Sequence, residues 1–296
     1  MDKILVTGAG GYIGSYVVSA LLDMGYSVVA SDIRPDTVDK RAIAIPCDIF
    51  SEKDPYHALG EPTVLIHMAW RDGFVHNAPS HLNDLPKHYD FIDRMVDAGV
   101  HSVNVMGSMH EIGFFEGAID ENTPQNPSSL YGISKNALRQ ALFTLQKTKK
   151  FDFKWLRGYY VCGDDKRNHS IFAKILEKEE AGEVTFPFTT GVNQYDFLSV
   201  EHLGLEIALA SVQNEVTGII NCCSGKPVAL KDKVETFIQK HKLSIRPAYG
   251  AFPDRPYDSK IIYGDSTKIK QIATAYLNGT SSAAIARVKA LLAELD

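Results

Sequence analysis

The feature that most constrains this chain is a glycine-rich turn between an apolar strand and an amphipathic helix. Residues 3–6 read KILV and predict a buried strand, residues 7–14 read TGAGGYIG, and a helical pattern follows over 14–24. Glycines at such a turn let backbone N–H groups approach a pyrophosphate at the helix N-terminus. The strand–turn–helix context therefore predicts a dinucleotide site. The residues expected to contact the dinucleotide there are Gly8, Gly11, Tyr12, Ile13 and Gly14.

Asp32 bears on which dinucleotide is bound. It ends the second predicted strand, 18 residues after Gly14, where a carboxylate can bind the hydroxyls of the adenosine ribose. A carboxylate repels the additional phosphate of NADP, so NAD is favoured. Arg34 lies two residues further on and could pair with that phosphate, which leaves NADP possible.

Short apolar runs alternate with helical patterns in the first half of the chain. Further strands are expected at 27–31, 42–45, 63–67, 102–106 and 153–156, and helices at 85–98 and 131–147. Such βαβ units predict an α/β fold with a doubly wound parallel sheet and helices on both faces. Glycines and prolines interrupt shorter elements beyond Gly158, which predicts a smaller, loop-rich substrate lobe. The expected division is a Rossmann domain over 1–157, receiving a strand and a helix from about 190–221, and a substrate lobe formed by 158–189 and 222–296.

Composition argues against several classes of function. The 296 residues carry a net charge of −5 without a basic cluster of the kind that nucleic acid requires. No apolar run approaches the ~20 residues that span a bilayer, and the N-terminus lacks a signal-peptide core. These features predict a cytoplasmic protein with reduced thiols and no metal site, because the cysteines lack ligand spacing. The cysteines are Cys47, Cys162, Cys222 and Cys223.

Tyr131 and Lys135 form a second candidate site. They lie four residues apart in a predicted helix that Ser128 or Ser129 can cap, so both side chains share one face. A neighbouring ammonium is expected to lower the pKa of the phenol, and the pair could then exchange a proton with a carbonyl or an alcohol near neutral pH. Such a pair is commonly part of a solvated helix face, but its place after a dinucleotide motif favours catalysis.

Together these motifs resemble the extended short-chain dehydrogenase/reductase superfamily, in its branch of sugar-nucleotide epimerases, dehydratases and reductases. Residues 7–14 match the TGxxGxxG loop of that family, residues 131–135 match YxxxK, and Ser108 matches the catalytic serine of its SSxxVYG segment. The resemblance implies a nicotinamide cofactor and a nucleotide-sugar substrate. It also implies three catalytic residues, Ser108, Tyr131 and Lys135.

Further segments match the family pattern, less tightly in the substrate lobe. Residues 47–49 lie where the family places an aspartate beside the adenine, and residues 67–70 read HMAW in place of HLAA, so Trp70 is a departure. The resemblance thus adds cofactor contacts at Asp48, Ile49, Met68 and Ala69, with Lys135 holding the cofactor ribose. In the substrate lobe, Arg255 resembles an arginine that holds a nucleotide phosphate, a task that suits a guanidinium fork.

Several activities of the branch remain open. Dehydratases carry Asp-Glu where this chain has Met109 and His110, which disfavours dehydration. His110 could be an extra acid/base, although a loop histidine with a backbone partner is the more common case. Two further polar residues are expected to be structural. His67 lies at a strand end, and Glu111 could pair with a cation.

The short substrate lobe favours an NAD(P)H-dependent reductase of a nucleotide-linked 4-keto-6-deoxysugar, in which hydride reaches C4 and Tyr131 protonates the oxygen. The alternatives are an NAD-dependent 4-epimerase and a non-catalytic, dinucleotide-sensing regulator. Relatives pair through the YxxxK helix, which suggests a homodimer. However, the leucines of that helix could equally serve the core of the monomer; they are Leu138, Leu142 and Leu145.

Overall fold

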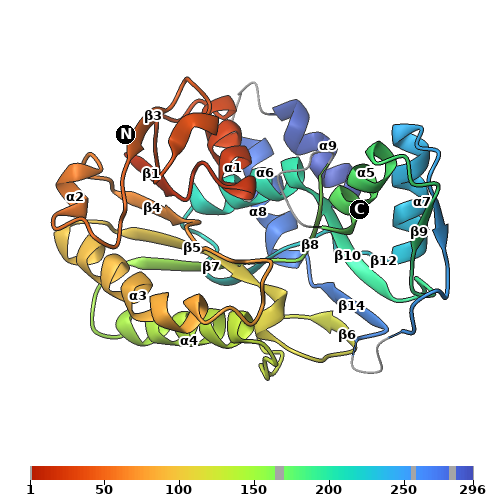
Figure 1. Ribbon diagram of the computed structural model, residues 1–296. Helices are drawn as coiled ribbons and strands as arrows, with labels where there is room; N and C mark the ends of the chain where they lie inside the picture. The colour runs from red at the N-terminus through yellow and green to blue at the C-terminus, as the bar shows by residue number, and fades with distance from the viewer. Residues whose placement is uncertain (1, 164–169, 255–257, 280–284, 296) are drawn as a thin grey trace.

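A seven-stranded, all-parallel sheet forms the centre of the computed structural model, which describes residues 2–163, 170–254, 258–279 and 285–295 (Figure 1). The strand order is β11-β7-β5-β4-β1-β2-β3. This doubly wound arrangement confirms the predicted α/β fold. The strands are β1 (Ile4–Thr7), β2 (Val28–Asp32), β3 (Ile43–Pro46), β4 (Val64–His67), β5 (Ser102–Ser108), β7 (Asp152–Gly158) and β11 (Gly218–Cys222).

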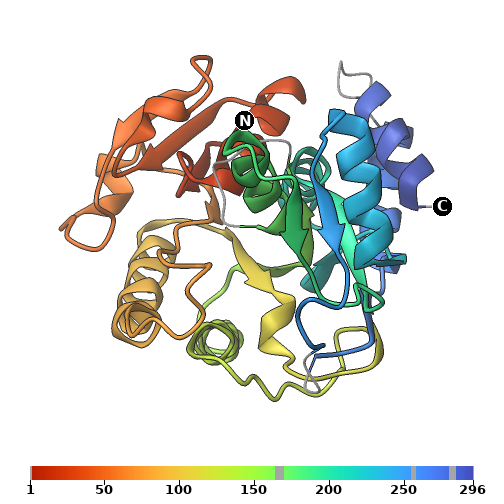
Figure 2. The same ribbon diagram turned by 45° about the vertical axis from the view of Figure 1, so that its right-hand side comes forward.

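Helices cover both faces of this sheet, as Figure 1 shows. One face carries α1 (Tyr12–Asp23), α6 (Val200–Ser211), α8 (Thr267–Gly279) and α9 (Ile285–Leu295), and the other carries α2 (Pro55–Ala58), α3 (Ser80–Ala98) and α4 (Leu130–Leu145). Side chains alternate between the two cores, so Ile4 and Val6 pack on the α1 side while Leu5 packs on the α3 side. The view along α4 in Figure 2 shows α3 beside it.

The leucines of α4 serve the monomer. Leu138 and Leu142 are completely buried and Leu145 nearly so, in the core between the sheet and the α3–α4 layer. Ser129 caps this helix as expected, because its Oγ accepts a hydrogen bond from the backbone N–H of Gly132 at 3.2 Å. By contrast, α3 begins at Ser80 rather than at residue 85, and it accommodates Pro86 within its length.

A smaller, five-stranded sheet lies beside the large one. Its order is β12-β10-β14-β6, with β8 paired to β10. The strand β6 comes from the chain before residue 157, whereas α6 and β11 belong with the large sheet and β10 with the small one. The chain therefore crosses between the two sheets repeatedly. The strands are β6 (Gly117–Ile119), β8 (Tyr160–Cys162), β10 (Gln194–Ser199), β12 (Pro227–Ala229) and β14 (Ile261–Gly264).

The small sheet and the remaining elements together form the second lobe. A short parallel pair joins β9 (Thr185–Pro187) to β13 (Arg246–Ala248). An aromatic core packs around it and the small sheet, between α5 (Ile171–Glu180) and α7 (Leu230–His241). Within the described residues no helix has the length and apolarity needed to cross a bilayer, and no His, Cys, Asp and Glu side chains cluster in a way that would hold a metal.

Candidate active site

A cleft of about 1370 Å³ opens where the carboxyl ends of β1, β4, β5 and β7 face the second lobe. Ligands bind at this edge of doubly wound sheets because the loops of neighbouring strands converge there. Several of the sequence-predicted site residues line the cleft. They are Gly8, Gly11, Tyr12, Ile13, Gly14, Met68, Ser108, His110, Tyr131 and Lys135.

The turn between β1 and α1 requires glycine at three positions, Gly8, Gly10 and Gly14. Gly8 has a φ of +69°, and a Cβ on it would lie 2.5 Å from the backbone nitrogen of Ala69. A Cβ on Gly14 would lie 2.1 Å from the carbonyl oxygen of Gly8. Gly11 begins α1 without a side-chain cap, so the first N–H groups of the helix can bind a pyrophosphate. The turn therefore fits a dinucleotide.

Asp32 stands beside this turn at the end of β2. Its carboxylate oxygens accept hydrogen bonds from the backbone N–H groups of Gly10, at 3.0 Å, and Arg34, at 3.1 Å. Because the carboxylate is fixed next to the turn, it can meet ribose hydroxyls and repel an additional phosphate. It does not itself line the cleft, and neither does the Arg34 side chain.

Three other predicted cofactor contacts also lie outside the lining of the cleft. Asp48 accepts hydrogen bonds from the backbone N–H of Phe50 and the hydroxyl of Ser51, at 3.1 and 2.9 Å. The Ile49 side chain is buried in the core on the α3 side, and the backbone of Ala69 packs against Gly8. Arg255 lies outside the described residues.

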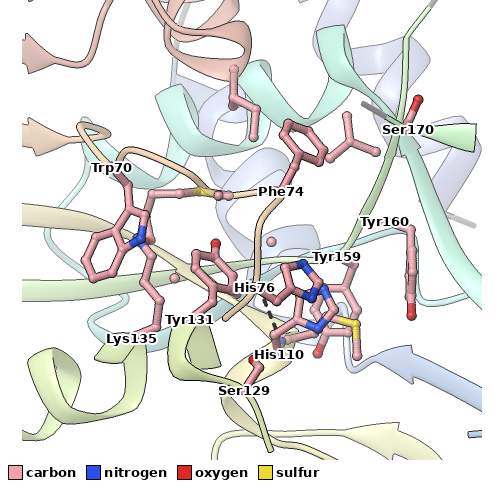
Figure 3. A pocket seen from close by; sticks show the side chains of 18 of the residues that line it. Trp70, Phe74, His76, His110, Ser129, Tyr131, Lys135, Tyr159, Tyr160 and Ser170 are labelled. Atoms are coloured by element: carbon pink, nitrogen blue, oxygen red, sulfur yellow. Dashed lines mark hydrogen bonds between the residues drawn. The ribbon is translucent and has the colours of Figure 1, made fainter. Parts of the chain in front are cut away.

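Ser108, Tyr131 and Lys135 come together from β5 and α4. Tyr131 lies in the first turn of α4 and Lys135 one turn later, and the Ser108 hydroxyl is close enough to the Tyr131 phenol to influence its pKa. The Lys135 ammonium donates to the carbonyl oxygen of Met106 at 2.7 Å. The arrangement brings two hydroxyls and a cation to the lining of the cleft; Figure 3 shows Tyr131 and Lys135 there.

Burial dominates the electrostatics of this trio. It raises the pKa of Tyr131 to about 12, an effect that the Ser108 hydroxyl only partly offsets. It also lowers the pKa of Lys135 to about 7. The expectation that the ammonium lowers the pKa of the phenol is therefore wrong, because loss of hydration disfavours the charged form of each group.

The sequence did not predict the histidine that faces Tyr131. His76 lies in the loop between β4 and α3, stacks on the Tyr131 ring at 5.6 Å between centroids, and accepts the Tyr131 backbone N–H on its carbonyl oxygen at 2.8 Å. Its ring lies 4.4 Å from that of His110, between centroids, and burial lowers the pKa of His110 to about 4. The sequence signal that could have identified His76 is its place in the chain, because it follows a strand whose carboxyl end faces the cleft.

Glu111 and His67 have structural contacts that connect neighbouring strands and helices. Glu111 is fully buried and accepts hydrogen bonds from Trp155 and Arg157, so Arg157 is the cation that pairs with it. The ring nitrogens of His67 bond to the Thr7 hydroxyl and to a ring nitrogen of His88, both at 2.8 Å. Burial lowers the pKa of His67 to about 3, which keeps it neutral.

Comparison with known proteins agrees with this geometry. Residues 4–223 match the model of the NAD dependent epimerase/dehydratase family. The chain is 44% identical over 268 residues to a dTDP-6-deoxy-L-talose 4-dehydrogenase (NAD(+)) from Aggregatibacter actinomycetemcomitans, covering 88% of this chain and 99% of the relative.

Solved structures give the same result for the fold. A UDP-glucose 4-epimerase superposes with a TM-score of 0.81 at 19% identity, over 99% of this chain and 96% of that one. MoeE5, in complex with UDP-glucuronic acid and NAD, superposes with a TM-score of 0.72 at 25% identity, over 91% of this chain and 92% of that one. The chain belongs to the NAD dependent epimerase/dehydratase family and is an NAD-dependent enzyme of the extended short-chain dehydrogenase type.

Proposed function

We propose that this protein is an NAD-dependent oxidoreductase that acts at C4 of a nucleotide-linked 6-deoxyhexose and reduces the 4-keto sugar. The observation that carries the proposal is the 44% identity to a dTDP-6-deoxy-L-talose 4-dehydrogenase across almost the whole length of both chains. The wall of the cleft formed by Tyr131, Lys135 and Ser108 supports the proposal, because these residues can exchange a proton with a carbonyl or an alcohol beside a dinucleotide site.

The turn at residues 8–14, the carboxylate of Asp32 and the ammonium of Lys135 would hold NAD. When bound, the nicotinamide supplies or accepts the hydride. In reduction, Tyr131 gives its phenolic proton to the oxygen on C4 while C4 gains the hydride, and the carbonyl becomes an alcohol. Ser108 orients the same oxygen by donating a hydrogen bond to it.

The protonation state of Tyr131 in the free protein suits the proton transfer that reduction requires. With a pKa of about 12, the phenol carries its proton at neutral pH, which is the form that can act as an acid. Oxidation of the alcohol would instead require Tyr131 as a base.

A 4-epimerase is the second candidate. The chain is 26% identical, over 91% of its length, to a putative UDP-glucose 4-epimerase from Methanocaldococcus jannaschii. An epimerase oxidises C4 and then reduces it from the other face, so its cofactor shows no net change. A dinucleotide-sensing regulator finds less support, because Tyr131, Lys135 and Ser108 are all present and all line the cleft.

The test is to follow the absorbance of reduced nicotinamide while the purified protein meets dTDP-linked 4-keto-6-deoxyhexoses, with NADH and NADPH in separate reactions. We expect stoichiometric oxidation of NADH with one of these sugars, and reduction of NAD when dTDP-6-deoxy-L-talose is supplied instead. Inversion at C4 of a UDP-hexose without net oxidation of NADH would establish the epimerase. Binding of dinucleotide without turnover of any of these sugars would favour the regulator.

A further inference from the structure

Trp70 places its indole ring against the ammonium of the catalytic lysine (Figure 3). The Nζ atom of Lys135 lies 3.8 Å from the centroid of the Trp70 ring, well inside the roughly 6 Å reach of a cation–π interaction. Lys135 is only 2% exposed, so few water molecules can solvate its charge. Of the three N–H donors of an ammonium, one bonds to Met106. The aromatic face therefore provides part of the electrostatic stabilisation that water would otherwise give the ammonium.

The indole is itself held from α3. It stacks on the ring of His88 with 4.4 Å between centroids and only 9° between planes. Its Nε1–H donates to Nδ1 of His81 at 3.0 Å, and Nε2 of His81 lies 3.0 Å from the carbonyl oxygen of Val75. Because Nδ1 accepts from the indole, Nε2 is the nitrogen that carries the His81 proton and donates to Val75. The Trp70 ring is thus fixed by a stacking partner and a hydrogen-bond partner.

The other titratable groups around Lys135 do little to stabilise its positive charge. Tyr131 on the same helix and His67 on β4 remain neutral at neutral pH, with pKa values of about 12 and about 3. Burial also lowers the pKa of His88 on α3. The carboxylate of Glu111 raises the pKa of Lys135, but that carboxylate is already paired with Arg157. Two aromatic faces favour the charged form, and the Trp70 indole is much the nearer, at 3.8 Å from Nζ compared with 5.9 Å for the Tyr131 ring.

We propose that Trp70 is a positioning residue that keeps Lys135 protonated and oriented towards the reacting groups. A charged Lys135 can hold cofactor hydroxyls and stabilise a developing phenolate on Tyr131, and a neutral amine does so poorly. The catalytic consequence rests on the function proposed above, whereas the effect on Lys135 itself does not. Trp70 is the residue at which residues 67–70 depart from the HLAA pattern of the family that the sequence resembles.

Two variants separate the aromatic face from the other contacts of Trp70. Trp70→Phe keeps a ring, Trp70→Leu removes it, and both lose the Nε1–H bond to His81. The measurement is a pH titration of protein labelled with 13C at the lysine Cε, without cofactor or substrate, in which the Lys135 resonance is the one absent from Lys135→Met. We expect Trp70→Leu to lower the titration midpoint of Lys135 by about one pH unit, and Trp70→Phe by less than half of that.

An unchanged midpoint in Trp70→Leu, or an equal decrease in both variants, would overturn the proposal. Should Trp70→Leu fail to fold, the emission of Trp70 in Trp155→Phe protein provides a second test, because the chain has only two tryptophans. That emission should change at the midpoint of Lys135 and lose this change in Lys135→Met; a change that survives in Lys135→Met contradicts the proposal. Since neither titration involves a sugar, failure of the proposed activity leaves both results interpretable.

Discussion

The two walls of the cleft are built in different ways. The cofactor wall is mainly backbone from one continuous segment, the turn over residues 8–14, whose shape depends on the absence of side chains at Gly8 and Gly14. The substrate wall is made of side chains from segments far apart in the sequence, including His76, His110 and Tyr160. Under the proposed function, the first wall would bind the cofactor that many such enzymes share, and the second would contact the sugar.

The largest effect should come from Tyr131, the proton donor of the proposed reaction. Tyr131→Phe keeps the ring that stacks on His76 but removes the acidic proton, so kcat should fall about a thousandfold, within the range for loss of a general acid. Affinity for NADH should change by no more than about twofold, as measured by fluorescence titration. A loss of kcat below about tenfold would show that another group delivers the proton.

A methyl group on the cofactor wall should have the next largest effect. In Gly14→Ala the new Cβ would lie 2.1 Å from the Gly8 carbonyl oxygen, so the turn must move. We expect NADH affinity to fall about a hundredfold, the equivalent of a strain of about 3 kcal/mol. Gly279→Ala is the matched control, because a Cβ there meets nothing within 4 Å. Normal NADH binding by folded Gly14→Ala protein would mean that the turn is not the pyrophosphate site.

The difference between the walls explains what could be predicted from sequence. The glycine turn, the parallel strands and the Tyr131–Lys135 pair are local patterns, and the sheet follows from their order along the chain. His76 and the contact between Trp70 and Lys135 depend on how the loop after β4 packs on α3 and α4, which no spacing records. The pKa of Tyr131 was predicted in the wrong direction for the same reason, since the extent of burial is a property of the assembled core.

Removing the charge of Asp32, which lies beside the glycine turn, should change the coenzyme preference. Asp32→Asn keeps an oxygen that can accept a backbone N–H bond but loses the repulsion of an additional phosphate. The ratio of NADPH to NADH affinity should rise about thirtyfold, corresponding to about 2 kcal/mol between nearby charges at a partly solvated site. Asp36→Asn loses the same charge on the exposed helix after β2, and its ratio should stay close to that of the wild type. An equal change in both variants would show a long-range effect of net charge.

The smallest effect is expected at His110, and it shows whether this histidine of the substrate wall is uncharged in the folded protein. Burial lowers the pKa of His110 to about 4 from its usual 6.5, so between these values the unfolded chain takes up the proton first and the folded protein loses stability as pH falls. From pH 7.5 to 5.5 this histidine should cost about 1.3 kcal/mol of unfolding free energy, and His110→Gln should remove that part of the pH dependence. Urea unfolding at both pH values measures the difference. An equal decrease in wild type and His110→Gln would mean that His110 titrates as an exposed histidine does, and a cationic group would then line the sugar side of the cleft at mildly acidic pH.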